Sequence, residues 1–424
     1  MSFTLRGLLS PRPRLGLLAW ASLSASPLLA GCESDPAADE TGDETGDETG
    51  DESSEDPCND PLQGVMRFEV VDGEPATTFI ELPFPILGLS DLAPAAIGDF
   101  DGDGHADYAL GRRISFGPLG PESEQLNLSL SGFSPTSALA LDVDGDGSDE
   151  LVLGLSHSEN GTPSLAYYTI SAAREAEASS LSWAEAPSWG QPELAAGDVD
   201  GDGLADLVSI GLGSFVIFHA DGQGGFEAQP RLLDYPLEDT ATAISLAQVD
   251  GQGGLDILTT HSETFTSSLL VTTGLEGDTP SFTSSPIDTP IYAATFGDFS
   301  QDGIIDAAFP SVTSFYLAIG AEDGSFASET LAFESLVYAS PEAVFSADFD
   351  GDGRLDVLFG PLGDASQELL FAPALAGGGL EEPQRMRVLD FEAYLSSPAI
   401  GDIDGDGAPE ALAFASSCQI GQIE

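Results

Sequence analysis

Residues 99–107 read Asp-Phe-Asp-Gly-Asp-Gly-His-Ala-Asp, and variants of this nine-residue pattern recur along the rest of the chain. Seven copies begin at residues 99, 142, 198, 248, 298, 348 and 402, so that neighbouring copies start 43 to 56 residues apart. Position 6 of the pattern is Gly in every copy, and position 9 is Asp or Glu in every copy. A repeat of this length predicts seven similar structural units that pack against one another.

The nine-residue pattern has the composition of a loop that wraps around a metal ion. Carboxylates at positions 1, 3 and 5 converge only if the backbone coils around one point, and the Gly at position 6 permits the positive φ that continues such a turn. Position 7 can offer its carbonyl oxygen whatever its side chain, and the acid at position 9 completes the ligand shell. Oxygen ligands in this number favour Ca²⁺. The pattern is not an EF-hand loop, because position 12, where an EF-hand needs Glu, is never acidic here.

Five copies keep all four acids, and the other two do not. Copy 4 has Gln248 and Gln252 at positions 1 and 5, and copy 5 has Ser300 at position 3. The pattern therefore predicts five to seven Ca²⁺ sites, with copies 4 and 5 the weakest. The predicted ligands, in chain order, are Asp99, Asp101, Asp103, His105, Asp107, Asp142, Asp144, Asp146, Ser148, Glu150, Asp198, Asp200, Asp202, Leu204, Asp206, Asp250, Asp256, Asp298, Ser300, Asp302, Ile304, Asp306, Asp348, Asp350, Asp352, Arg354, Asp356, Asp402, Asp404, Asp406, Ala408 and Glu410.

Short apolar segments flank each copy of the pattern. Residues 108–110 and 151–153 follow copies 1 and 2 with strand-forming side chains, and the residues before each copy are also apolar. Several units contain a later Asp-Gly turn between two further apolar runs, for example at Asp221 and Asp323, which is a hairpin signal. Each unit of about 50 residues therefore holds four strands, the composition of a propeller blade. Only Ala172–Ala178 has a helical pattern, so the sequence predicts an all-β, seven-bladed propeller.

These features together resemble the FG-GAP/VCBS repeats of integrin α-subunit propellers and of many bacterial surface proteins. Phe116-Gly-Pro118 and Phe359-Gly-Pro361 resemble the motif that names this family. The resemblance covers residues 61–424 and implies that each acidic loop joins the first and second strands of a blade and binds Ca²⁺.

The two ends of residues 61–424 are predicted to close the ring together. The last acidic loop is followed by one strand, residues 411–416, and an extra hairpin with strands at 65–71 and 77–82 precedes the first loop. Placing this hairpin in the last blade closes the ring and leaves no open sheet edge. Cys58 and Cys418 flank these segments, so we expect a disulfide between them, with two free thiols as the alternative.

The first 60 residues differ in composition from the repeats. Residues 1–31 hold three Arg, no acid and an apolar run from Leu15 to Leu29, which is the pattern of a secretory signal. The final Leu-Ala-Gly before Cys32 resembles the lipobox of bacterial lipoproteins, in which the Cys is acylated. Residues 32–60 contain thirteen acids and a Thr-Gly-Asp-Glu tract, which predict a disordered tether. We expect an exported bacterial lipoprotein, attached through Cys32 to the outer membrane or cell surface; an ordinary signal peptide is the alternative.

The chain is strongly acidic, with 72 Asp and Glu against 11 Arg, no Lys and a formal net charge of −61. A polyanion of this strength repels phosphate groups, which argues against nucleic acid and anionic lipid headgroups as binding partners. Of the 72 acids, 25 lie at positions 1, 3, 5 and 9 of the loops and 13 lie in the tether. The predicted ion sites and the tether therefore account for about half of the acids.

No set of residues in the sequence predicts catalysis. The four His are far apart in sequence, and the repetition of the acidic loops favours structural metal over an active site. We therefore expect a monomeric, non-catalytic binding or adhesion module for a protein or glycan ligand. The alternative is a Ca²⁺-dependent polysaccharide lyase or hydrolase, which a channel-facing position of Arg112 and Arg113 would favour.

Overall fold

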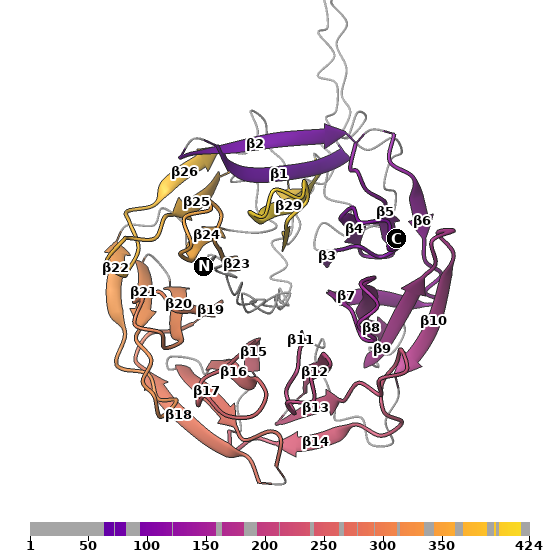
Figure 1. The fold of residues 1–424 in the computed structure, drawn as a ribbon. Coiled ribbons are helices and arrows are strands. Elements are labelled where there is room, and N and C mark those ends of the chain that lie inside the picture. The colour runs from indigo at the N-terminus through magenta and orange to yellow at the C-terminus, as the bar shows by residue number, and fades with distance from the viewer. Residues whose placement is uncertain are drawn as a thin grey trace, which may run out of the picture.

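The chain folds into seven antiparallel sheets, which are arranged as blades around a central axis (Figure 1). This is an all-β, seven-bladed propeller, as the sequence predicts. No helix lies within the described residues, and hence no helix that could cross a membrane. The computed structural model describes residues 63–71, 73–81, 94–120, 122–157, 163–181, 193–211, 213–237, 241–262, 267–277, 279–291, 293–311, 314–334, 343–360, 368–387, 394–395 and 398–416.

Each of the first six blades is a four-stranded sheet whose strands follow one another from the centre of the ring to its rim (Figure 1). The blades are numbered here by the acidic loop that they contain. Blade 1 consists of β3 (Ala95–Gly98), β4 (Asp107–Leu110), β5 (Arg113–Ser115) and β6 (Gln125–Asn127). Blade 2 consists of β7 (Phe133–Leu141), β8 (Glu150–His157), β9 (Pro163–Ile170) and β10 (Ala176–Leu181). Blade 3 consists of β11 (Glu193–Gly197), β12 (Asp206–Gly211), β13 (Ser214–Phe218) and β14 (Arg231–Asp234). Blade 4 consists of β15 (Ala241–Ala247), β16 (Asp256–Ser262), β17 (Ser267–Thr273) and β18 (Ser281–Ile287). Blade 5 consists of β19 (Thr295–Gly297), β20 (Asp306–Ser311), β21 (Ser314–Ala318) and β22 (Thr330–Glu334). Blade 6 consists of β23 (Ala343–Ala347), β24 (Asp356–Gly360), β25 (Glu368–Ala372) and β26 (Gln384–Arg387).

The seventh blade combines strands from both ends of the described chain. Its inner edge is formed by β27 (Tyr394–Leu395) and β28 (Ala399–Gly401), which both pair with β29 (Glu410–Ser416). The two outer strands are the N-terminal hairpin, β1 (Gln63–Val71) and β2 (Glu74–Glu81), with β1 paired to β29 from Gln63 opposite Ser416 to Phe68 opposite Ala411. The hairpin thus closes the ring, which is the closure that the sequence predicts.

Each acidic loop joins the innermost strand of its blade to the second strand, for example β3 to β4 and β7 to β8. Because the strand order is the same in every blade, all seven loops lie at the same end of the ring. Neighbouring loops touch there: the N–H of Asp149 in loop 2 donates to the carbonyl of Asp99 in loop 1 at 2.9 Å, and Leu255 in loop 4 donates to Asp198 in loop 3 at 2.7 Å.

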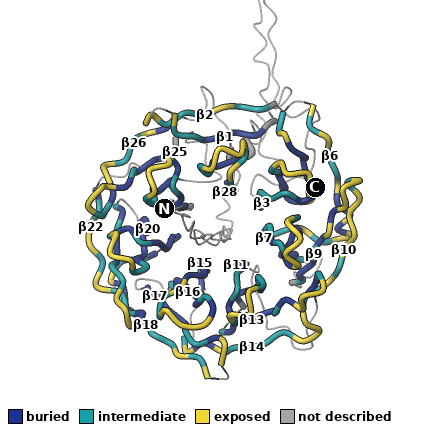
Figure 2. The backbone as a smooth tube through the Cα atoms, in the orientation of Figure 1, coloured by how far each residue is buried: buried dark blue, intermediate teal, exposed yellow. Residues whose placement is uncertain are grey.

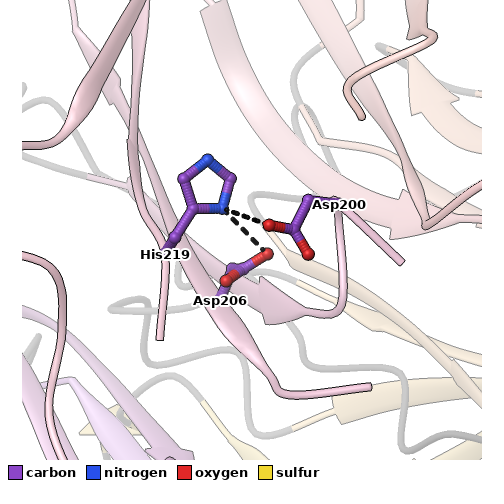
Figure 3. Close-up of side chains that lie close together, drawn as sticks. All are labelled: Asp200, Asp206 and His219. Atoms are coloured by element: carbon purple, nitrogen blue, oxygen red, sulfur yellow. Dashed lines mark ion pairs between the residues drawn. The ribbon is translucent and has the colours of Figure 1, made fainter. Parts of the chain in front are cut away.

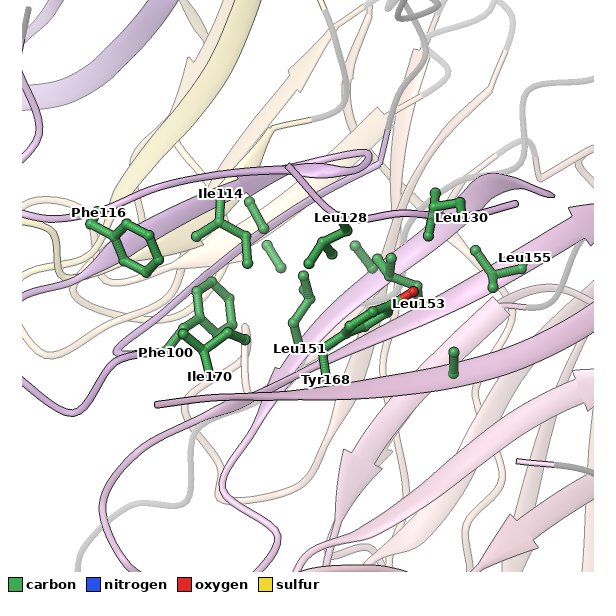
Figure 4. Close-up of a cluster of buried hydrophobic side chains, with 14 residues drawn as sticks. Phe100, Ile114, Phe116, Leu128, Leu130, Leu151, Leu153, Leu155, Tyr168 and Ile170 are labelled. Atoms are coloured by element: carbon green, nitrogen blue, oxygen red, sulfur yellow. The ribbon is translucent and has the colours of Figure 1, made fainter. Parts of the chain in front are cut away.

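The hydrophobic core is divided into seven clusters, one at each contact between neighbouring blades. Alternate residues of a strand face opposite sides of a sheet, so Leu151 and Leu153 of β8 pack toward blade 1 whereas Val152 packs toward blade 3. Figure 4 shows the cluster between blades 1 and 2, where Phe100 and Ile114 meet Leu151 and the blade-2 strands. Both faces of a middle strand are buried, which explains why the sequence reads as apolar runs rather than as alternation.

Burial is greatest in the middle strands of a blade and least at the rim of the ring (Figure 2). All residues of β13, the third strand of blade 3, are buried, whereas the outermost strand β14 alternates between exposed and half-buried residues. The smallest cluster lies between blades 7 and 1 and contains Val65, Tyr108 and Leu412 among its five buried residues. Among the described residues, the contact between blade 7, which the N-terminal hairpin completes, and blade 1 therefore has the fewest buried apolar side chains.

Two details of the sequence-based assignment are wrong. Ala172–Ala178 is not helical: it forms a turn between β9 and β10, where Arg174 has a φ of 61°, followed by the first residues of β10. The fourth strands of blades 3 and 5 begin later than predicted, because Phe226 and Phe326 form only isolated bridges and the outer strands start at Arg231 and Thr330. In blades 3 and 5 the connection before the fourth strand is therefore longer than the Asp-Gly pair alone indicates.

Replacing Phe68 of β1 tests whether the hairpin is an integral part of the ring. Phe68 is 2% exposed in the cluster between blades 6 and 7, so Phe68→Ala is expected to lower the free energy of unfolding by ~3–5 kcal/mol. Val71→Ala on the same strand is the control, since Val71 is 48% exposed and the change should stay within ~0.5 kcal/mol. Urea unfolding measures both, and equal effects of the two substitutions would contradict the closure.

Candidate metal centres

The side chain at position 1 organises the backbone of each acidic loop. In loop 1 the two carboxylate oxygens of Asp99 accept hydrogen bonds from the N–H groups of Asp103 and Gly104 at 3.0 and 2.9 Å. The same bond from the position-6 glycine to the position-1 carboxylate is present in loops 2, 3, 5, 6 and 7, at 2.8 to 3.1 Å. Gly104 has a φ of 86°, a conformation that glycine adopts without strain. This is the coiled backbone that the spacing of the acids predicts.

The acid at position 9 is buried in all seven loops, with an exposed fraction of 5% or less. Asp107 accepts hydrogen bonds from the N–H of Phe100, at position 2 of the loop, and from the N–H of Gly117 beyond the third strand, at 2.9 and 2.7 Å. Asp206 and Asp356 make the equivalent pair of bonds in blades 3 and 6. In blade 5, Asp306 accepts from the N–H of Ser300, at position 3, and from the N–H of Gly320. In these four blades position 9 therefore holds the loop and the third strand together, a role that the sequence does not indicate.

The predicted ligands come together in the loops. Carboxylate oxygens lie within 4.8 Å of one another at positions 1, 3 and 9 of loops 1 and 6 and at positions 1, 3 and 5 of loops 2 and 3, a spacing that could hold a metal ion. The N–H at position 7 donates to the carboxylate at position 5 in loops 1, 2, 3, 5, 6 and 7. The donor set is composed of hard oxygen atoms, which fits a divalent cation such as Ca²⁺.

Loop 4 differs from the others because an amide replaces the carboxylate at position 1. The Nε2 of Gln248 donates to the carbonyl of Gly254, at position 7, at 2.8 Å, and its Oε1 accepts from the N–H of Gly251 at 2.8 Å. The position-9 acid of this loop, Asp256, accepts hydrogen bonds from the backbone N–H groups of Val249 and Asp250. The amide hydrogens of Gln248 thus satisfy the carbonyl that is expected to bind the ion in other loops.

Basic side chains contact four of the loops, and in three of them the basic residue comes from another segment. Arg174, from the turn between β9 and β10, lies 2.7 Å from Asp101 in loop 1 and also contacts Asp103. Arg67 of β1 lies 2.7 Å from Asp404 and 2.8 Å from Glu410 in loop 7, and Arg354 pairs with Asp352 within loop 6. The imidazole of His219 contacts two acids of loop 3. Sequence reasoning missed the first two partners and His219, because they lie far from the loops in sequence and outside the repeated pattern.

A carboxylate outside the pattern lies between loops 1 and 2. Asp149 occupies position 8 of loop 2, where the other loops have apolar residues, and accepts a hydrogen bond from the N–H of Asp99 at 2.9 Å. Burial raises the pKa of Asp149 to about 6, and the nearby charges of Asp142 and Asp99 add to the effect. Its position next to a loop acid gave no signal in the sequence, since Asp is common throughout these loops.

Burial also raises the pKa of the position-9 acids, to about 7 for Asp107 and Glu150 and to about 6 for Asp256 and Asp356, although backbone hydrogen bonds oppose the shift. These values lie above those of the unfolded chain, so the folded, metal-free protein binds protons more tightly than the unfolded protein. The contribution of these groups to stability is therefore present at low pH and is lost as pH rises from about 4 to about 7. A bound cation would reverse this dependence, because it stabilises the ionised form.

The adjacent pair Arg112 and Arg113, which would favour an enzyme if it faced the channel, does not lie on an innermost strand. Arg112 is exposed in the turn between β4 and β5, and Arg113 lies on β5, the third strand of blade 1. The guanidinium of Arg113 donates to Asn127 on the outermost strand β6 at 3.1 Å. The pair therefore gives no support to an active site in the channel. The predicted signal segment 1–31, the predicted tether 32–60 and the cysteines at 32, 58 and 418 lie outside the described residues.

A model of the FG-GAP-like repeat matches residues 198–259 and 298–359. Each match begins at position 1 of an acidic loop and ends in the second strand of the next blade. The chain carries FG-GAP-like repeats. Each match spans two consecutive acidic loops and parts of two neighbouring blades.

This chain is similar to known solved structures. One is a lectin of Agrocybe aegerita, whose title describes specific recognition of non-reducing terminal N-acetylglucosamine; it is 16% identical, covers 78% of this chain and 91% of its own, and has a TM-score of 0.54. Another is the Tc holotoxin pore of Photorhabdus luminescens, which is 18% identical with a TM-score of 0.40. The match covers 83% of this chain but only 16% of the toxin chain. No curated protein matches the sequence.

Proposed function

We propose that this protein is a calcium-stabilised FG-GAP-like propeller that binds a protein or glycan ligand at the bacterial cell envelope and has no catalytic activity. The observation that carries the proposal is the convergence of carboxylate oxygens to within 4.8 Å in loops 1, 2, 3 and 6. Unneutralised carboxylates at this separation repel one another, and a divalent cation with six to eight oxygen ligands removes that repulsion. The ions then hold the connections between first and second strands in these loops in a fixed shape.

A fixed ring of loops is suited to binding rather than to turnover. The described residues of the loops are used in the same way from blade to blade, with position 1 and position 9 bonded to backbone N–H groups, and such repetition is typical of a scaffold. The lectin with the same fold is described as recognising a terminal sugar, which makes glycans the first ligands to test. Function does not follow from fold alone, so the choice of ligand rests on measurement.

The location at the envelope is proposed from the sequence, since residues 1–60 lie outside the described part of the chain. The structure adds one supporting observation for the disulfide between Cys58 and Cys418. Gln63 and Ser416 are directly opposite each other in the pairing of β1 with β29, and the two cysteines lie five residues before the first and two after the second. A bond there would close a loop of 360 residues and stabilise the ring by ~4–5 kcal/mol in the chain-entropy model.

Intact-mass measurement of the protein isolated from the envelope tests both covalent proposals. We expect a chain that starts at Cys32 and carries acyl groups, with a further increase of two hydrogens when Cys58 and Cys418 are reduced. Cys32→Ala should release the protein from the membrane fraction, and Cys58→Ala is the matched control that should leave it anchored. An unacylated chain would contradict the anchor, and two alkylatable thiols without reductant would contradict the disulfide.

A glycan array probed with the purified protein tests the binding function. We expect binding to a restricted set of glycans, loss of that binding in EDTA, and its recovery when Ca²⁺ is added back. An assay for cleavage of the bound glycans is run beside it. Cleavage of a specific polysaccharide would overturn the proposal that the protein is non-catalytic. Binding that is unaffected by EDTA would contradict the proposal that binding depends on calcium.

A further inference from the structure

The third blade contains a histidine that points into its acidic loop. His219 follows the last residue of β13, and its ring faces the carboxylates of Asp200 and Asp206, with Nδ1 3.3 Å from an oxygen of each (Figure 3). The Asp206 side chain is 1% exposed and the His219 side chain 17% exposed. Nδ1 itself is buried and forms no hydrogen bond of ordinary geometry. These three residues form a compact group whose ligand atoms all lie within 4.8 Å of one another.

This histidine is specific to blade 3 among the blades in which its position can be compared. It precedes Ala220, the residue whose N–H donates to the position-9 acid. The residues that precede the equivalent donors in blades 1, 5 and 6 are Phe116, Ile319 and Pro373. The blade fold therefore does not require an imidazole here, which separates His219 from the repeated scaffold.

The distances fit ligands around a shared ion better than a direct ion pair. Charge-assisted hydrogen bonds between nitrogen and a carboxylate oxygen are ~2.7–2.9 Å long, whereas His219 lies at 3.3 Å from two carboxylates at once. Ligand atoms bound to one metal at ~2.1 Å lie ~3.0–3.4 Å apart in octahedral or tetrahedral geometry. One imidazole nitrogen with two carboxylates is a donor set that suits zinc and related first-row metals, whereas Ca²⁺ takes oxygen ligands.

We propose that His219, Asp200 and Asp206 form a metal site in blade 3 that binds a divalent transition metal, with Zn²⁺ as the representative ion, in preference to Ca²⁺. The bound metal would connect three segments of the blade: the acidic loop through Asp200, the start of β12 through Asp206 and the end of β13 through His219. The inference does not depend on calcium in the other loops, so it can hold or fail independently of the proposed function.

Zn²⁺ titration of the full chain by calorimetry, in the presence of excess Ca²⁺, tests the proposal. The unaltered protein is expected to bind one equivalent of Zn²⁺ that Ca²⁺ does not displace. His219→Ile, which introduces the residue that blade 5 has at this place, should lower that affinity by ~100-fold or more, since even outer-shell changes at metal sites cost 10- to 100-fold. His157→Ile removes the histidine at the end of β8, outside the acidic loops, and should leave the Zn²⁺ affinity unchanged.

X-ray absorption at the zinc edge of the loaded, unaltered protein gives a second reading that does not require a variant to fold. Scattering from an imidazole ring in the first shell, lost in His219→Ile, would support the site. A shell of oxygen atoms alone, or an equivalent of Zn²⁺ that binds equally well after His219→Ile, would overturn it. Absence of tight Zn²⁺ binding would instead leave His219 as an ion-pair partner of the two acids, which also overturns the proposal.

Discussion

The buried carboxylate at the ninth position of loops 1, 3, 5 and 6 connects parts of a blade that are distant in sequence. Asp107 begins the second strand, accepts the N–H of Phe100 from the loop before it and accepts the N–H of Gly117 from the end of the third strand. Its place is fixed by these bonds, and the acids at positions 1 and 3 converge on it. The geometry of the blade thus collects negative charge at its inner turn, and the rest of the loop has to compensate for that charge.

The loops compensate in different ways. Loop 4 has lost two of its acids, and the amide of Gln248 bonds to the carbonyl of Gly254. In loops 1, 6 and 7 an arginine contacts the acids, and in loop 3 a histidine does so. Within the described residues, loop 2 has converging carboxylates and no ion pair to Arg or His, so a cation should matter most there. A ring of seven similar loops can therefore contain sites of different strength and selectivity.

The sequence predicts the blade count, the connection made by each loop and the closing hairpin, because all three depend on local patterns. The nine-residue spacing determines how the loop coils, and the hairpin at 63–81 is recognisable from its own turn. The sequence does not predict the basic residues that contact the loops, because Arg174, Arg67 and His219 come close to them only in the tertiary fold. Position 9 was predicted as a ligand, and its bonds to two backbone segments could not be inferred without knowing where the third strand ends. The presence and identity of the ions remain predictions.

Thermal unfolding of the same preparation in Ca²⁺ and in EDTA, at about pH 7.5 and about pH 5, tests the central claim that cations neutralise the converging carboxylates. The account predicts that Ca²⁺ raises the melting temperature by ~10 °C or more near pH 7.5, since several sites contribute together. It also predicts a smaller difference near pH 5, where protons take over part of the neutralisation at Asp107, Glu150, Asp256 and Asp356. Identical melting curves in Ca²⁺ and EDTA near pH 7.5 would contradict it.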